Sequence, residues 1–156
     1  MGKSAVSQGV YDALKQAKKL PWLINQDKVE WAIFDDCAMN FYKIQKTMDG
    51  LFWEIMRQIL QGLKAPDVLI LEVTSKHILH KVKSFASYMV YIEPDVVHGQ
   101  THVYNVHRRG GDLPAPTFDF WEEVNSTTVP REILKASEPL EDKINRVTFD
   151  VLEMLG

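Results

Sequence analysis

The apolar run from Val68 to Val73 constrains the fold of this chain more than any other feature of the sequence. It has the length of a strand, is rich in branched residues, and stands between Pro66 and Ser75, which predicts a buried β-strand. A buried strand needs a packed core around it. The composition is suitable, since 156 residues suffice for one domain and 46% apolar with 25% charged residues is typical of globular proteins.

Helical spacing of apolar residues predicts helices on the N-terminal side of this strand. The residues from Val6 to Ala17 repeat at that spacing and predict a first helix that ends before Pro21. A capping box at Asp27 and a long apolar face predict further helix to residue 63, with a break at Asp49-Gly50 because one helix of that length is long for this domain. The alternative for residues 29–34 is a strand, because Trp, Ile and Phe favour strands.

Turn residues divide the middle of the chain into short elements. Ser75 predicts the cap of a short helix that reaches Val82, and residues 85–92 and 101–108 read as two strands joined by a loop with proline and glycine. We expect these two strands to form an antiparallel hairpin.

Two helices are predicted at the C-terminal end of the chain. Thr128 with Pro130 predicts a short helix, and Ser137 with Pro139 predicts the start of the last one. The last helix has an apolar stripe, formed by Leu140, Ile144, Val147, Val151 and Met154.

The expected fold class is α+β, in one domain that spans residues 1–156. A small, mainly antiparallel sheet of three to four strands, within residues 67–109, would pack against N-terminal helices in 4–63 and C-terminal helices in 130–155. An irregular arm over residues 110–130 would join the sheet to the last helices, because this segment is rich in proline and glycine.

Cysteine content and hydropathy predict a cytoplasmic protein, or part of a particle assembled in the cytoplasm. The single cysteine, Cys37, excludes an intramolecular disulfide and a thiolate zinc site. The N-terminal residues lack the apolar segment of a secretion signal, and no apolar run is long enough to span a membrane. We therefore expect no membrane association.

The net charge of −3 is unevenly distributed along the chain. Residues 112–156 carry ten acidic and four basic side chains, a net charge of −6, which would repel nucleic-acid phosphates. Nucleic acid is therefore not an expected partner. The same acidic surface supports one hypothesis, an inhibitor that blocks the nucleic-acid site of another protein; the alternative is a solvated acidic face.

All five histidines lie between residues 77 and 107, which raises the hypothesis of a metal-dependent hydrolase or nuclease. The candidate metal ligands are His98, His102 and His107, because imidazole is a common zinc ligand. The alternative is that these histidines lie singly at the surface or partly buried.

Asp67 and Glu72 partly match the acidic residue and Glu-x-Lys pattern of metal-dependent nucleases. Thr74 stands where that pattern needs lysine, and two residues five apart on one strand face opposite ways. A structural strand flanked by ordinary charges therefore explains them better.

Arg108 and Arg109 precede two glycines and are candidate anion-binding residues. Glycine lets backbone N–H groups approach an anion, and arginine supplies a forked pair of donors. The same residues would also suit an ordinary turn.

The arm contains the candidate partner-binding residues, which combine aromatic rings with acids: Phe118, Phe120, Trp121, Glu122 and Glu123. Such clusters anchor protein partners. The alternative is that the rings fold back as a lid on the core of their own domain.

The sequence has no phosphate loop, dinucleotide fingerprint, nucleophile elbow or zinc-protease motif, and we expect no cofactor. The leading hypothesis is a non-enzymatic interaction or structural subunit of a homo-oligomeric or larger assembly, with contacts through the arm and the chain ends.

Overall fold

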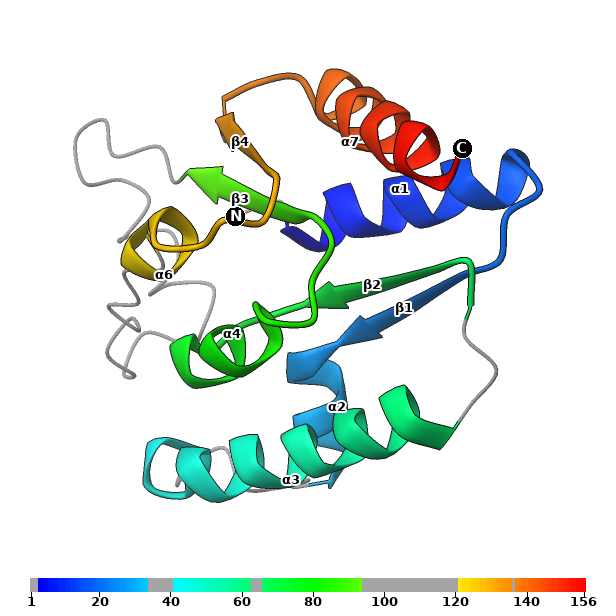
Figure 1. Ribbon diagram of the computed structural model, residues 1–156. Helices are drawn as coiled ribbons and strands as arrows, with labels where there is room; N and C mark the ends of the chain where they lie inside the picture. The colour runs from blue at the N-terminus through cyan, green and yellow to red at the C-terminus, as the bar shows by residue number, and fades with distance from the viewer. Residues whose placement is uncertain (1–2, 34–40, 63–65, 94–120, 136) are drawn as a thin grey trace.

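The computed structural model describes residues 3–33, 41–62, 66–93, 121–135 and 137–156. This part of the chain contains both helices and strands and is of the α+β class (Figure 1). The described elements are α1 (Lys3–Gln16), β1 (Pro21–Asn25), α2 (Gln26–Ile33), α3 (Phe41–Gly62), β2 (Val68–Glu72), α4 (Lys76–Val82), β3 (Met89–Glu93), α6 (Trp121–Asn125), β4 (Arg131–Lys135) and α7 (Leu140–Leu155).

The described strands form two parallel pairs, so the predicted antiparallel sheet of three to four strands is wrong. β1 pairs with β2, with Pro21 opposite Val68 and Asn25 opposite Glu72. β3 pairs with β4 in the same parallel sense, although 37 residues separate the two strands. Because parallel strands must be joined by a crossover, each pair encloses at least one helix between its members.

Helices cover the strands on two sides (Figure 1). On one side, α1 and α7 lie together and bury Val6, Val10 and Val147 in a cluster that includes Leu134 of β4. On the other side, α3 and α4 bury a second cluster, which contains Phe52, Met56 and Ile78. Aliphatic side chains of β2 take part in both clusters, so this strand is covered on both of its faces.

The packing of α1 against α7 depends on a glycine. A Cβ atom at Gly9 would lie 2.2 Å from Cδ1 and 2.7 Å from Cγ1 of Ile144, which is closer than carbon atoms can approach. The missing side chain therefore gives Ile144 the space to pack against α1. This contact helps to fix where α7 lies on the domain.

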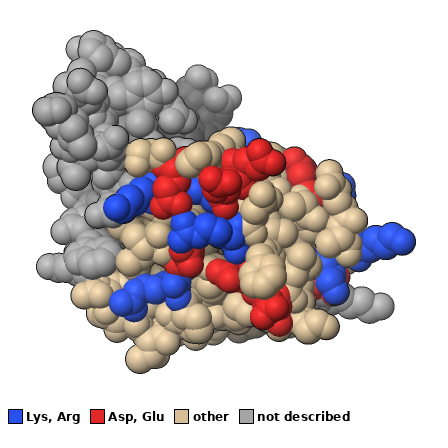
Figure 2. All heavy atoms as spheres, turned by 90° about the horizontal axis from the view of Figure 1, so that it is seen from above, with Lys and Arg blue, Asp and Glu red and all other residues tan. Residues whose placement is uncertain are grey.

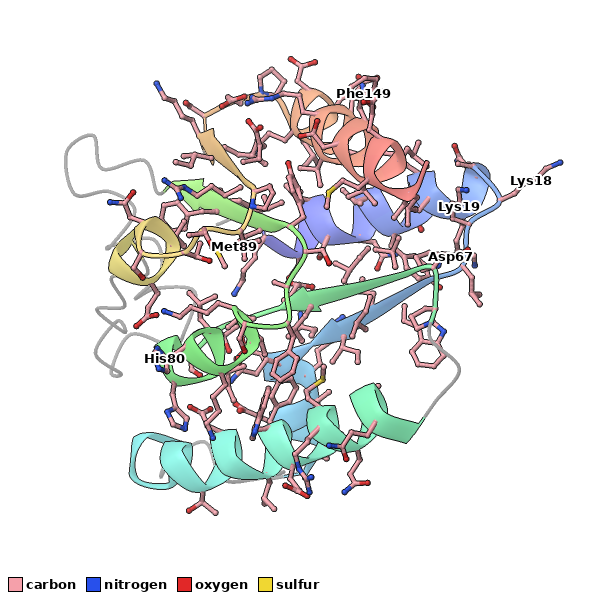
Figure 3. All side chains as sticks on the ribbon, viewed as in Figure 1. Lys18, Lys19, Asp67, His80, Met89 and Phe149 are labelled. Atoms are coloured by element: carbon pink, nitrogen blue, oxygen red, sulfur yellow. The ribbon has the colours of Figure 1, made fainter. Side chains whose placement is uncertain are left out.

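α1 ends in a Schellman motif that leads the chain into β1. Lys18 has a left-handed backbone with φ of 61°, and the Lys19 N–H donates to the Leu14 carbonyl over 3.0 Å. Asp67, just before β2, accepts a hydrogen bond from the Leu20 N–H over 2.7 Å, and its own N–H donates to the Leu20 carbonyl. The start of β2 is thus tied to the turn before β1, and Figure 3 shows Asp67 beside that turn.

Three helix predictions are confirmed and two are wrong. The first helix, the Ser75-capped helix and the last helix are present as α1, α4 and α7. The predicted break at Asp49-Gly50 does not occur, since α3 continues through both residues. A Cβ atom at Gly50 would face open space. The segment after Pro130 is the strand β4 and not a short helix.

The strand predictions are also mixed. β2 is confirmed, and the alternative strand at residues 29–34 is wrong for residues 29–33, which belong to α2. The strand predicted for residues 85–92 begins later, at Met89, and β1 was not predicted at all. Residues 101–108 lie outside the described residues.

α3 is the longest of the described helices, with 22 residues, and it packs one face on the second cluster. Neither α3 nor any other helix among the described residues is long and apolar enough to cross a membrane.

Candidate functional site

The outer face of α7 exposes an aromatic ring. The helix buries Lys143, Val147 and Thr148 on the side that meets the domain, and partly buries Ile144 and Val151 beside them. The residues on the opposite side are exposed and follow the helical repeat: Asp142, Asn145, Arg146, Phe149 and Glu153. We call these five residues the outer face of α7.

Phe149 is the only apolar residue of this outer face, and 63% of its surface is exposed. Figure 3 shows it on the side of α7 that points away from the rest of the chain. Beside it lies an open hollow of about 400 Å³, lined by Glu132, Asn145, Arg146, Phe149 and Asp150. An exposed ring beside a hollow is an arrangement that a partner surface can fill.

Arg146 forms the charged edge of this hollow. Its guanidinium group makes ion pairs with Glu132 of β4 and Glu138 of the β4–α7 turn. The hydrogen bond from the Lys135 N–H, together with the Arg146 charge, holds the pKa of the Glu138 carboxyl below its ordinary value. Basic and acidic side chains are interleaved on the face of the molecule that α7 covers (Figure 2).

Tyr88 bonds to Asp150, one of the residues that line the hollow. Its hydroxyl donates a hydrogen bond to Asp150 over 2.7 Å, which connects the segment before β3 to α7. Burial and the bonded carboxylate both raise the pKa of the Tyr88 hydroxyl, so it keeps its proton and remains a donor. One lining residue of the hollow, Asp150, is therefore held in place by a hydrogen bond.

A second notable region is a buried polar cluster where β1 and β2 end, which we call the strand-end cluster. It consists of Gln26, Glu30, Asp49 and Ser75, which come from α2, α3 and the cap of α4. The Gln26 amide Nε2 lies 3.0 Å from Glu30 Oε1, 3.1 Å from Asp49 Oδ1 and 3.2 Å from Ser75 Oγ.

Burial changes the chemistry of one carboxyl group in this cluster. Glu30 is 1% exposed and Asp49 is 3% exposed. Desolvation, with smaller contributions from Asp49 and Asp27, raises the pKa of the Glu30 carboxyl from 4.5 to about 8. Ligands of open parallel sheets bind at this end of the strands, but here the side chains are covered.

Glu72, the last residue of β2, is held apart from the strand-end cluster by other partners. Ser4 donates to its Oε1 over 2.9 Å, and the Asn25 amide donates to its Oε2 over 3.1 Å. Asp67 lies at the opposite end of β2, bonded to the backbone of Leu20. The structure therefore separates the two acids of the nuclease-like pattern.

Of the predicted partner-binding residues, Glu123 is the one whose side chain the structure describes. Lys83 donates to it over 2.7 Å, and His80 Nδ1 lies 3.2 Å from the same oxygen. The hydrogen bond from Lys83, and then that from His80, holds the pKa of the Glu123 carboxyl below its ordinary value. Its neighbour Val124 is 2% exposed and packs on Leu79 and Met89, so this end of the arm contacts its own domain.

The other predicted site residues are described in part or not at all. Trp121 and Glu122 belong to α6, and nothing is described of their side chains. Outside the described residues lie the remaining aromatic, anion-binding and metal candidates: Phe118, Phe120, Arg108, Arg109, His98, His102 and His107. Within the described part of the chain, no group of three or more His, Cys, Asp or Glu residues is arranged to hold a metal ion.

Sequence reasoning missed both regions described above. Phe149 lies off the apolar stripe of the last helix, and an aromatic residue among Arg146, Asp150 and Glu153 was the signal that could have indicated it. Gln26 and Glu30 have the spacing of neighbours on a helix, but Asp49 is 23 residues away from Gln26 and joins them only through the fold.

Comparisons with known proteins found no relative. No family model matches the chain, and neither a curated protein nor a solved structure matches it. The function must therefore be argued from the described surfaces.

Proposed function

We propose that this chain is a non-enzymatic interaction subunit that associates with a second copy of itself in the cytoplasm, through the outer face of α7. The observation that supports this proposal is Phe149, an aromatic ring left 63% exposed in the middle of a helix whose other side is buried. Burial of an aromatic ring contributes strongly to the stability of a protein interface.

The position of Phe149 suits an antiparallel pair of α7 helices. Phe149 lies near the middle of the helix Leu140–Leu155, so a twofold axis at this residue would place the two rings against each other. The helices would then overlap along most of their length. Each ring could also cover the hollow beside the ring of the other copy.

The charges on the outer face support the same arrangement. Arg146 lies about 4.5 Å before Phe149 along the helix axis, and Glu153 lies about 6 Å after it. In an antiparallel pair, Arg146 of one copy would therefore lie within about 2 Å, along the axis, of Glu153 of the other copy. The twofold axis produces this pairing of opposite charges twice.

A second copy explains these features better than a uniformly charged partner does. Acidic and basic groups are interleaved on this face of the molecule (Figure 2), and both signs are needed for a self-complementary contact. An interface of one helix from each copy is small, so we expect a weak, concentration-dependent dimer.

The test is sedimentation velocity of the whole chain over a wide range of concentration, with the variant Phe149→Ser. The unchanged protein should dimerise, and the variant should weaken the dimer by about tenfold or more because the interface loses its aromatic anchor. The matched control is Leu51→Ser, which removes another exposed apolar residue, 45% exposed, from the helix α3.

The control should leave association unchanged. A monomer at all concentrations, or equal effects of the two substitutions, would overturn the proposal.

A further inference from the structure

The strand-end cluster joins segments that are far apart in the sequence. The Gln26 carbonyl Oε1 accepts hydrogen bonds from the backbone N–H groups of Thr74 and Ser75, over 2.9 and 3.3 Å. These two donors fix the orientation of the amide, so its Nε2 must face Glu30 and Asp49. One side chain thus connects α2 and α3 to the residues that follow β2.

The two carboxyl groups of this cluster lie side by side. Glu30 Oε1 and Asp49 Oδ1 accept hydrogen bonds from the same Gln26 nitrogen, over 3.0 and 3.1 Å, and both residues are buried. Two ionised carboxylates repel each other in such a site, which favours a proton on one of them.

No positively charged group of the described residues is among those that shift the pKa of the Glu30 carboxyl, so none offsets its negative charge. The charged groups that face it in the described structure are both acidic: Asp49 from α3 and Asp27 from its own helix. Gln26 offers a neutral amide, and Ser75, from the cap of α4, offers a hydroxyl. Glu72, at the end of β2, is bonded to Ser4 and Asn25 instead.

We infer that the strand-end cluster is a pH-sensitive latch, in which a proton on the Glu30 carboxyl, beside Asp49, holds α2 and α3 to the ends of β1 and β2. Loss of the proton places two negative charges side by side in a buried site. The charges then repel, the Gln26 bonds to Thr74 and Ser75 weaken, and the cap of α4 loosens with them.

The pH range of the latch follows from the pKa of Glu30. An unfolded glutamate loses its proton near the ordinary pKa of 4.5, whereas the folded chain keeps it to about pH 8. The folded state therefore loses stability as the pH rises from about 4.5 to about 8, and above that range both states are ionised. The latch is fully closed in mildly acidic solution and opens in the mildly alkaline range.

The test compares chemical unfolding of the whole chain with that of Glu30→Gln between about pH 5 and about pH 9. The unfolding equilibrium constant of the unchanged protein should rise more steeply with pH than that of the variant, by up to about tenfold per pH unit, until about pH 8. Glutamine has the same shape but does not titrate, so Glu30→Gln should lack this extra pH dependence and be the more stable protein at pH 8. The control Glu54→Gln changes an exposed carboxyl and should retain the extra pH dependence.

A second measurement uses the unchanged protein, in case the variant does not fold. The carboxyl carbon of Glu30, followed by NMR as the pH changes, should titrate near pH 8, and the amides of Thr74 and Ser75 should lose protection against hydrogen exchange in the same range. An ordinary glutamate titration, or an identical pH dependence of the unchanged and Glu30→Gln proteins, would overturn the inference.

Discussion

The outer face of α7 leaves an aromatic ring in solvent, whereas the strand-end cluster encloses two carboxyl groups in the interior. Phe149 is 63% exposed, and Glu30 is 1% exposed. Each region reverses the usual distribution of apolar and charged groups. Each could be compensated by something added to the chain: in the proposed dimer a second copy would cover the ring, and a proton would remove one of the two buried negative charges. Residues whose environment opposes their chemistry are therefore candidates for function.

The two regions also differ in what their hydrogen bonds contribute to stability. Arg146 makes its ion pairs at the surface, where water competes for the charges and an exposed pair contributes little. Gln26 makes its bonds in the interior, where a group left without a partner costs much more. Substitutions in the two regions should therefore have effects of very different size.

The largest effect is expected from Gln26→Met, which keeps the volume of the side chain and removes its hydrogen bonds. Glu30 and Asp49 would lose a donor, and two backbone N–H groups would lose their acceptor, so the free energy of unfolding should fall by about 3 kcal/mol or more. Urea denaturation measures the loss. The control Gln58→Met removes an exposed glutamine that bonds to Glu54 and should be nearly neutral.

A fall of similar size in the Gln58 control would mean that burial does not decide how much a lost glutamine hydrogen bond costs. A neutral Gln26→Met would mean that the strand-end cluster does not hold the helices.

An intermediate effect is expected where α1 supports α7. Gly9→Ala places a Cβ against Ile144, whereas Gly50→Ala places one in open space on α3. Alanine favours the helix at both positions. The difference between the free energies of unfolding of the two variants therefore measures the packing cost, and Gly9→Ala should be the less stable variant by about 2 kcal/mol. Thermal unfolding of the two variants checks this, and equal stabilities would show that Ile144 has room to move.

The smallest effect is expected at the surface. Arg146→Gln removes both ion pairs of the outer face, yet it should lower the free energy of unfolding by less than about 1 kcal/mol, because the Arg146 side chain is 45% exposed. Urea denaturation at low and at high salt measures this. A loss as large as that of Gln26→Met would contradict the contrast between the two regions.

Elements with a local signal could be predicted from the sequence. Ser75 caps α4 through its own side chain, which accepts a hydrogen bond from the Ile78 N–H over 3.2 Å, and the sequence places cap and helix side by side. The last helix was predicted because its stripe repeats at helical spacing. Val147, Ile144 and Val151 of this stripe are buried or partly buried. Leu140 and Met154, near the helix ends, are exposed. In both cases the residues that decide the structure are neighbours in the chain.

Elements that depend on distant partners could not be predicted. β1 has only five residues, and its Pro21 reads as the end of a helix until β2 pairs with it. β4 follows a helix-start signal at Pro130, and its parallel pairing with β3 overrides that signal. Whether two strands pair in a parallel or an antiparallel sense depends on how the segment that joins them packs, and not on the residues of the strands alone.

The same reason explains what was missed at the two regions. The exposure of Phe149 follows from which side of α7 meets α1, and the burial of Glu30 follows from where α3 packs. The spacing of residues gives neither fact. The end of the arm shows the converse case, since the sequence predicts Glu123 as a partner-binding residue, whereas in the fold it bonds to Lys83 of its own domain.

The central claim, that two copies associate through antiparallel α7 helices, is tested most directly by exchanging charges between copies. Arg146→Glu and Glu153→Arg each place like charges together in a homodimer, so each variant alone should sediment as a monomer. In an equimolar mixture, the introduced glutamate of one variant would meet the introduced arginine of the other, and the unchanged Glu153 would meet the unchanged Arg146, so the mixture should dimerise. A mixture that remains as monomeric as its components, while the unchanged chain dimerises, would contradict the account.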